Sequence, residues 1–447
     1  GNVVTDQAVF DHLVRLRPGS IYAPQSVYAS QSDLLALGVF SGVDIKMLDP
    51  DVPEARKNVV VTVRERLPHS FTLSPGLSSG EGARLELDYT QRNLFGYALE
   101  LVSRAKVSYQ LFYPLLPGDL RDRYQRLGFL EGLEGWVVAG LPWPRLWFLR
   151  KDVAARVDLV GLQDHALSHD LTKVSLVPGV DFKLTEDLAL TVEYEIEYDY
   201  LSCPPGQQCG GAAAEKWIRY DEGSLLLGAL RPELSWDRRD NIFWPHRGTF
   251  LALRTELANN FLEDREVFYF KLDALVSGYI PLGRETTLAL SVRGGAIFQL
   301  TGDSRTPAHK RFWLGGRNTV RGYPEEGLLP ADQVNPEDPG SPCVPETDRE
   351  GEERCISLGG NAYVNLKAEV RTPLVPGTLE GALFVDAGNL WLDPAHFDPF
   401  PLRPTAGFGL RFVPPIGPVA FDFGFNLDPD EDRREPLWNL HFNIGMF

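Results

Sequence analysis

The sequence predicts an all-β transmembrane barrel of about 16 antiparallel strands, preceded by a small α+β domain. Two observations carry this prediction. From residue 68 to Phe447, apolar residues alternate with polar or charged ones in long runs, and no helical pattern of any length interrupts them. Every second connection between these runs is short, and the two longest connections both fall in the other set. Residues 1–67 and 68–447 are therefore expected to form two domains.

The composition excludes several classes of protein. The chain has 447 residues, a formal net charge of −17 and 11% aromatic residues. Disordered chains lack aromatic residues, and an acidic chain lacks the clustered lysines and arginines that bind nucleic acid. The sequence has no run of 18 apolar residues that would predict a transmembrane helix. It opens on GNVVTD without a signal peptide, so we expect it to be cut from a longer protein.

The first 67 residues mix two helices with two strands. Thr5 is expected to cap a first helix whose apolar residues repeat at helical spacing. Pro24 is expected to open a second helix that stops at Gly38. The runs VFSGVDIKML and KNVVVTVRER then alternate as strands do. This order predicts a small α+β domain.

The remaining runs alternate apolar residues with charged ones. In ARLELDYT, for example, Leu85 and Leu87 lie on the face opposite to Glu86 and Asp88. A set of soluble sandwiches is the alternative, but these usually hold 7–9 strands in about 100 residues. The strands here are long and no linker divides them. A membrane barrel explains the pattern better, because its apolar face meets lipid, its polar face lines the lumen and it has no free edge.

The four cysteines form two local pairs in loop-like sequence. If the first strand runs away from the N-terminal domain, both pairs fall in the long loops on the far side, the second in a loop at about residues 301–358. Neither pair has CxxC spacing or a nearby histidine, which argues against zinc. We expect two disulfides in an oxidising compartment, Cys203–Cys209 and Cys343–Cys355.

Two sequence matches suggest an enzyme or a metal site, and both fail on context. GLSSG (Gly76–Gly80) fits G-x-S-x-G, but a charged strand follows it where a nucleophile elbow needs a helix. DPDEDR begins like a calcium loop, but Arg433 stands where glycine is required and Asn439 where glutamate is required. We therefore expect no enzymatic activity, no cofactor and no metal site.

Five motifs stand out in the barrel part of the sequence, namely VRGY (Val320–Tyr323), FVDAGN (Phe384–Asn389), SWDRRDNIFWPHRGTF (Ser235–Phe250), FGLRFVPPIGPVAFDFG and the terminal HFNIGMF. Together they resemble the BamA/TamA-type family of outer-membrane β-barrel insertases. The segment LLALGVFSGVDI resembles the POTRA domain that precedes such barrels. Family members carry several POTRA domains, so residues 1–67 are expected to be the last of a series.

The expected position of Arg321 follows from strand parity, which is the alternation of inward and outward side chains along a strand, and from this resemblance. Parity places Glu369 and Asp386 inside the barrel on neighbouring strands, where two carboxylates need a cation. The resemblance implies that the long loop at about residues 301–358, called loop six, folds back into the lumen and offers Arg321 to them. Guanidinium suits this task because it stays charged and binds carboxylates with two hydrogen bonds. The expected lumen brace comprises Val320, Arg321, Gly322, Tyr323, Glu369 and Asp386.

The first and last strands are expected to form a weak seam. Pro75 in the first strand cannot donate a ladder hydrogen bond, and Gly445 weakens the last strand. An ordinary closed barrel with an imperfect seam is the alternative. The resemblance implies that this seam is a lateral gate. Its expected residues are Phe71, Leu73, Pro75, Leu440, Phe442, Gly445 and Phe447.

The resemblance implies assembly or insertion of other outer-membrane proteins. It also implies residence in the bacterial outer membrane with the N-terminal domain in the periplasm. Expected partners are unfolded β-barrel clients, periplasmic accessory proteins such as lipoproteins or a TamB-like protein, lipid and lipopolysaccharide, with no nucleic acid. Two alternatives stay open, which are a two-partner-type polypeptide secretion pore and a passive porin.

Overall fold

The structure is a computed structural model of the whole chain. It describes residues 4–111, 128–143, 153–165, 169–202, 223–242, 244–261, 266–283, 285–334, 340–342, 345–347, 353–355, 357–376, 378–412 and 419–444.

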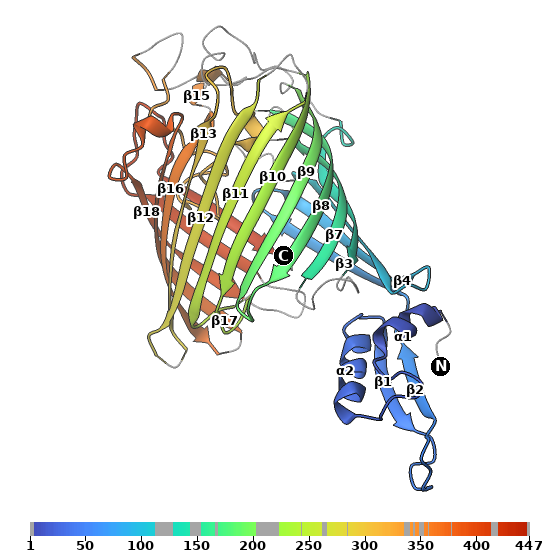
Figure 1. Ribbon diagram of the computed structural model, residues 1–447. Coiled ribbons are helices and arrows are strands. Elements are labelled where there is room, and N and C mark those ends of the chain that lie inside the picture. The colour runs from blue at the N-terminus through green and yellow to red at the C-terminus, as the bar shows by residue number, and fades with distance from the viewer. Residues whose placement is uncertain are drawn as a thin grey trace.

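The N-terminal domain consists of two helices and a two-stranded sheet. Its elements are α1 (Gln7–Leu13), α2 (Pro24–Leu35), β1 (Phe40–Met47) and β2 (Val59–Glu65). Pro24 begins α2 as expected, because proline at the first helical turn leaves no hydrogen bond unmade. Phe10, Leu34, Phe40 and Val63 meet in a buried core between the helices and the sheet. Figure 1 shows this domain below the barrel.

The expected cap of α1 was wrong by one residue. Asp6 is the N-cap and accepts a hydrogen bond from the Ala8 N–H (2.8 Å). Thr5 is buried instead. Its hydroxyl donates to Glu65 Oε1 (2.6 Å) and accepts from Asn93 Nδ2 (2.8 Å). Asn93 belongs to the barrel, so Thr5 ties the two domains together rather than capping the helix.

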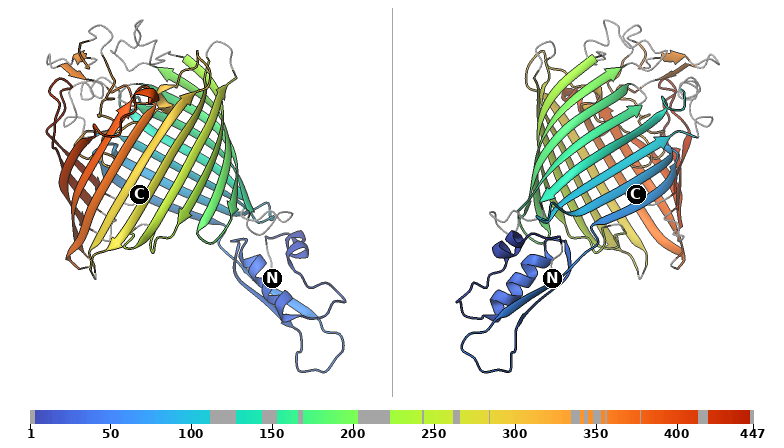
Figure 2. Two further views of the ribbon diagram at one scale, coloured as in Figure 1. Left: turned by 60° about the vertical axis from the view of Figure 1, so that its left-hand side comes forward. Right: turned by 90° about the vertical axis from the view of Figure 1, so that its right-hand side faces the viewer.

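Sixteen strands form the closed antiparallel barrel, and each pairs with its neighbour in sequence until the last strand meets the first. Figure 2 shows the tilted strands from two further sides. The strands are β3 (His69–Ser78), β4 (Gly82–Leu94), β5 (Leu99–Tyr109), β6 (Leu133–Trp143), β7 (Val153–His165), β8 (Asp170–Lys183), β9 (Leu188–Ser202), β10 (Gly223–Asp237), β11 (Gly248–Asn260), β12 (Phe268–Pro281), β13 (Thr287–Gln299), β16 (Ala362–Val375), β17 (Leu379–Trp391), β18 (Arg403–Phe412), β19 (Val419–Asn426) and β20 (Trp438–Ile444).

Loop six joins β13 to β16 and carries small elements of its own. They are the short helix η2 (Ala308–Lys310) and a hairpin of β14 (Pro345–Thr347) and β15 (Glu353–Cys355). A second short helix, η3 (Pro394–His396), follows β17. No helix in the described ranges is long and apolar enough to cross a membrane.

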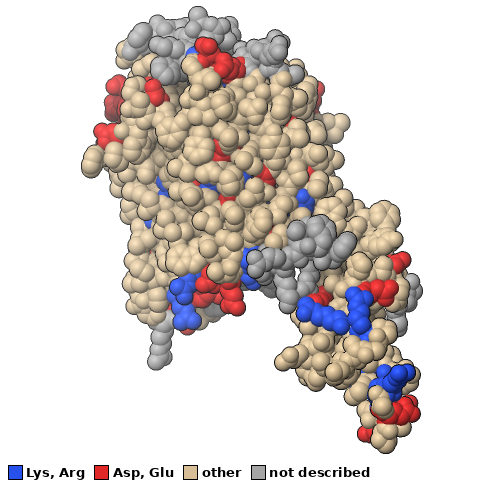
Figure 3. Space-filling model, viewed as in Figure 1, with Lys and Arg blue, Asp and Glu red and all other residues tan. Residues whose placement is uncertain are grey.

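The outer surface of the barrel is apolar around its middle. Side chains such as Leu253, Val292 and Leu383 point outward and are exposed. In Figure 3 the charged residues on the visible face gather mainly near the two ends of the barrel. This distribution fits a band that faces lipid, flanked by polar rims.

The lumen differs from the uniformly polar interior that alternation predicts. Inward-facing Leu225, Leu227 and Tyr269 form an apolar patch on β10 and β12. Loop six packs on this patch with Phe312, Leu314, Val320, Tyr323 and Leu328. The patch can be apolar because the loop, rather than water, covers it. The barrel is therefore partly filled from within.

Candidate functional site

Arg321 lies at the tip of loop six, deep inside the barrel. It is 2% exposed, and Val320 and Tyr323 on either side of it are fully buried. Asp386 on β17 is 0% exposed and Glu369 on β16 is also buried. The structure thus places the loop residues and both strand carboxylates in one buried cluster.

The guanidinium of Arg321 contacts both carboxylates. Its Nε and Nη2 donate to Asp386 Oδ2 (2.6 Å) and Oδ1 (2.8 Å), which is a two-pronged contact. Its Nη1 donates to Glu369 Oε2. The ring of Phe384, which lies 3.4 Å from the guanidinium carbon, stacks against the same group. Planar geometry, charge and stacking together favour arginine over lysine here.

Two glycines let the loop backbone approach the wall. A Cβ on Gly424 of β19 would collide with the carbonyl oxygen of Arg321. A Cβ on Gly322 would lie 2.5 Å from Cγ2 of Thr405 on β18. Neither clash could be relieved without moving the loop away from β18 and β19. The glycines therefore fix how deeply Arg321 is inserted.

Loop six also contacts the last strand. His441 of β20 donates from Nε2 to the carbonyl oxygen of Arg321 (3.1 Å). Tyr323 donates from its hydroxyl to Glu435 (2.7 Å) in the loop between β19 and β20, and it accepts from Asn426 Nδ2 (2.9 Å). The brace thus spans β16 to β20 rather than β16 and β17 alone.

Further charges surround the brace. Arg371 donates to Glu369 Oε1 (2.7 Å), and Arg411 lies 2.7 Å from Asp422. Burial alone would lower the pKa of Arg321, but the carboxylates of Asp386 and Glu369 outweigh it and raise that pKa further. The two carboxylates therefore favour the charged form of Arg321.

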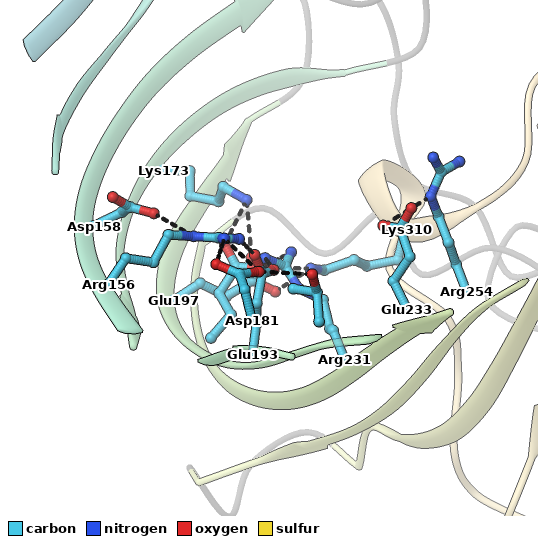
Figure 4. A network of polar contacts seen from close by, with 12 residues as sticks. Arg156, Asp158, Lys173, Asp181, Glu193, Glu197, Arg231, Glu233, Arg254 and Lys310 are labelled. Carbon is cyan, nitrogen blue, oxygen red and sulfur yellow. Dashed lines mark hydrogen bonds and ion pairs between the residues drawn. The ribbon is translucent and has the colours of Figure 1, made fainter. Parts of the chain in front are cut away.

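A second attachment of loop six was not predicted from the sequence. Lys310 in η2 reaches the opposite wall and contacts Glu197 of β9. Lys173 of β8 bonds to both Glu195 (3.0 Å) and Glu197 (3.1 Å), and Arg231 of β10 contacts Glu195. Figure 4 shows Lys310 extending toward these strand residues. Burial disfavours the charge on Lys310, but Glu256, Glu197 and Glu195 outweigh that effect and raise its pKa.

Two features of the sequence signal this second attachment. In VEYEIEYDY every second residue is acidic, which places four carboxylates in one inward column and requires cations from elsewhere. The run SLLLGAL breaks the alternation of β10, and strands covered on both faces read as such apolar runs. Together they indicate a segment packed inside the barrel at β9 and β10. The four carboxylates are Glu193, Glu195, Glu197 and Asp199.

The seam between β3 and β20 is short in the described residues. It consists of Asn443 opposite Ser78 and Ile444 opposite Leu77, with a further hydrogen bond from the Ser79 N–H to the Phe442 carbonyl oxygen (3.0 Å). By contrast, β19 and β20 pair continuously from Val419–Ile444 to Phe425–Trp438. The seam joins the end of β3 that lies away from the N-terminal domain to the last described residues of β20. Each strand therefore continues beyond the contact, β3 toward the N-terminal domain and β20 away from it.

The predicted seam residues lie mostly beside this contact rather than in it. Phe71, Leu73 and Pro75 belong to the part of β3 that no described residue of β20 pairs, and Phe71 is 70% exposed. Leu440 and Phe442 lie on β20 above Ile444, and the backbone of Phe442 reaches Ser79. Gly445 and Phe447 lie outside the described residues.

Comparison with known proteins agrees with this architecture. Residues 137–447 match the family model described as the Omp85 superfamily domain. The chain belongs to the Omp85 superfamily. Residues 1–66 match the POTRA family, described as a surface antigen variable number repeat. This Omp85 protein is a barrel of the bacterial outer membrane with its POTRA domain on the periplasmic side.

The curated relatives of this Omp85 chain are distant. The outer membrane protein assembly factor BamA of Neorickettsia risticii is 25% identical over 94% of this chain and 51% of its own length. The mouse sorting and assembly machinery component 50 homolog is 26% identical over 81% of this chain and 68% of its own. BamA of Neisseria meningitidis serogroup B is 28% identical over half of this chain and 29% of its own. The chain thus spans about half or less of the BamA relatives that it matches.

Solved structures show the same fold. BamA from Haemophilus ducreyi lacking POTRA domains 1–3 superposes with a TM-score of 0.75 at 17% identity, covering 99% of this chain and 82% of that one. CdiB from Acinetobacter baumannii superposes with a TM-score of 0.55 at 11% identity, covering 99% and 72%.

The cysteine pairs stay predictions. Cys203, Cys209 and Cys343 lie outside the described residues. Cys355 ends β15 and stands opposite Pro345 in the hairpin of loop six.

Proposed function

We propose that this Omp85 protein assembles other β-barrel proteins into the outer membrane by opening the seam between β3 and β20. The observation that carries the proposal is the short seam, which among the described residues consists of the pairs Asn443–Ser78 and Ile444–Leu77 and the hydrogen bonds between Ser79 and Phe442. Each backbone pair lost in lipid leaves polar groups unsatisfied. A barrel therefore opens first where it has the fewest pairs to break.

The part of β3 that pairs with no described residue of β20 is suited to receive a client strand. Phe71 and Leu73 face outward, and the backbone from His69 to Pro75 pairs with no described residue of β20. An unpaired edge adds a strand by forming main-chain hydrogen bonds, which do not depend on the sequence of the client. Such a mechanism needs no covalent chemistry, cofactor or nucleic acid.

The POTRA domain supplies a second docking place on the periplasmic side. In the described part of the chain β1 and β2 pair only with each other, and a sheet edge that pairs with no other strand can take up an extended peptide. We expect unfolded barrel clients there, together with periplasmic accessory proteins of the lipoprotein or TamB-like kind. At the seam, lipid and lipopolysaccharide are the expected neighbours. The names of the BamA relatives, which are assembly factors, support this proposal.

A reversible crosslink tests the gate. Cysteines at Leu77 and Ile444 would stand opposite each other across the seam, within the reach of a disulfide. The matched control places cysteines at Leu253 and Ala274, which are opposite on β11 and β12. With the protein reconstituted in vesicles, folding of an unfolded client barrel is followed by its protease resistance. We expect the oxidised seam variant to lose assembly, the reductant to restore it, and the control to work in both states.

The outcomes separate the alternatives. Equal client folding by the oxidised and reduced seam variants would refute the gate. Transfer of a soluble polypeptide into the vesicles with the seam crosslinked would favour the secretion pore. A large, steady conductance without any effect on clients would favour the porin, but the loop packed against β10 and β12 argues against an open channel.

A further inference from the structure

Three donor groups meet where η2 approaches β9. They are the carboxylates of Glu197 and Asp199, two residues apart on the inward face of β9, and the imidazole of His309 next to Lys310. One ligand atom from each residue lies within 4.8 Å of the others. None of the three is used by the proposed seam or by the Arg321 brace.

The donors are buried and two of them lack hydrogen bonds. Asp199 is 0% exposed, and neither of its carboxylate oxygens has a hydrogen-bond partner among the described residues. The side chain of His309 is also buried, and neither of its ring nitrogens hydrogen-bonds to any residue in the described part of the chain. A buried carboxylate without hydrogen bonds is costly unless a cation neutralises it. The arrangement therefore calls for a positive charge between Asp199 and His309.

An ion pair between the two residues is the simplest source of that charge. His309 Nε2 lies 3.3 Å from Asp199 Oδ2, but the contact does not satisfy hydrogen-bond geometry. A charge-assisted hydrogen bond of this kind is usually about 2.7–2.9 Å long. Two ligands at about 2.0–2.2 Å from a tetrahedral zinc ion lie about 3.4 Å apart. The observed spacing thus fits two ligands of one metal better than a direct hydrogen bond.

We propose that Glu197, Asp199 and His309 bind a divalent transition-metal ion such as zinc. One imidazole nitrogen with carboxylate oxygens is a ligand set for zinc-class ions, whereas calcium and magnesium favour oxygen alone. Because His309 belongs to loop six and the carboxylates to β9, the ion would fasten the loop to the wall opposite Arg321. It would complete the second attachment that Lys310 begins.

Lys310 competes with the metal for Glu197. Its Nζ contacts Glu197 Oε1, and Lys173 holds the other oxygen (3.1 Å). Glu195 lies 4.0 Å from the same Nζ and offers Lys310 another partner when the metal takes Glu197. Removal of the Lys310 charge should therefore strengthen metal binding.

Zinc titration of the full chain tests this site. The tag-free protein in detergent is stripped with a chelator and titrated with zinc chloride, with calorimetry as the readout. We expect one equivalent of zinc to bind. His309→Asn and Asp199→Asn should each weaken zinc binding by roughly 100-fold, and Lys310→Met should strengthen it by about tenfold. His396→Asn is the matched control, because His396 also pairs with one aspartate, Asp332 (3.0 Å), but away from this cluster. Magnesium chloride should not bind.

Three results would overturn the proposal. The first is the absence of stoichiometric zinc binding. The second is equal zinc affinity of the parent protein, His309→Asn and Asp199→Asn. The third is an equal loss of zinc affinity in His309→Asn and in the control His396→Asn. Circular dichroism and thermal melting establish that each variant is folded. Should His309→Asn fail to fold, the other two variants still decide, because the proposal requires Asp199→Asn to weaken zinc binding and Lys310→Met to strengthen it.

Discussion

Replacement of Arg321 by alanine should cost the barrel about 3–5 kcal/mol of unfolding free energy, the usual effect of breaking a buried ion pair. The change removes two hydrogen bonds to Asp386 and one to Glu369. Hydrogen bonds to charged groups contribute about 1.5–3 kcal/mol each, so their gross value is larger than the expected loss. Glu369 keeps its hydrogen bond from Arg371 (2.7 Å) in this variant. The lost stability therefore comes chiefly from Asp386, whose charge is left without its arginine.

A double-variant cycle isolates the contact with Asp386. In Arg321→Ala, the charged carboxylate of Asp386 stays buried without its arginine. The double variant Arg321→Ala, Asp386→Asn removes the charge of the aspartate as well. We expect the second change to restore part of the loss, with a coupling energy of about 2–3 kcal/mol. Urea unfolding in detergent micelles, followed by tryptophan fluorescence, measures each variant.

Arg104→Ala is the matched control. Arg104 lies 3.3 Å from Asp88, and the two side chains are 58% and 37% exposed. Exposed pairs of this kind contribute less than about 1 kcal/mol. If Arg321→Ala unfolds at the same urea concentration as Arg104→Ala, the brace does not stabilise the barrel and the reasoning from burial is wrong.

Two further predictions concern loop six. Gly424→Ala should destabilise the barrel and expose the loop to protease, because a Cβ there collides with the Arg321 carbonyl oxygen. The control is Gly278→Ala on β12, where nothing lies within 4 Å of the added Cβ, so neither stability nor protease sensitivity should change. Equal protease sensitivity of the two variants would contradict this prediction. In the unfolded protein, Cys343 and Cys355 should resist alkylation until a reductant is added, and Cys203 and Cys209 should do the same. The intact mass of the protein measures how many cysteines are alkylated. Alkylation of either pair without reductant would exclude that disulfide.

Strand periodicity was enough to predict the barrel and the faces of β16 and β17. Because side chains alternate strictly, an apolar set such as Val364 and Leu366 fixes where Glu369 points. The neighbourhood of Glu369 and Asp386 then follows from antiparallel order. Strand order and parity act locally, so a single sequence suffices for them.

Contacts across the lumen could not be predicted in the same way. Parity indicates that Glu197 faces inward, but it does not indicate which segment crosses the lumen to meet it. Lys310 and His309 lie in a loop without periodicity, so the sequence does not fix their direction. The extent of the seam was equally hidden, because it depends on the stagger of β20 against β3 around the closed ring.

The contacts of loop six place the proposed gate and the brace in one mechanical unit. Arg321 bonds through its side chain to β16 and β17, but through its carbonyl oxygen to His441 of β20. If β20 moves away from β3 as proposed, either the His441 bond breaks or the loop follows β20. The charged contacts with Asp386 are the stronger ones, so the His441 bond should yield first. Loop six would then hold the rest of the wall in place while the last strand opens.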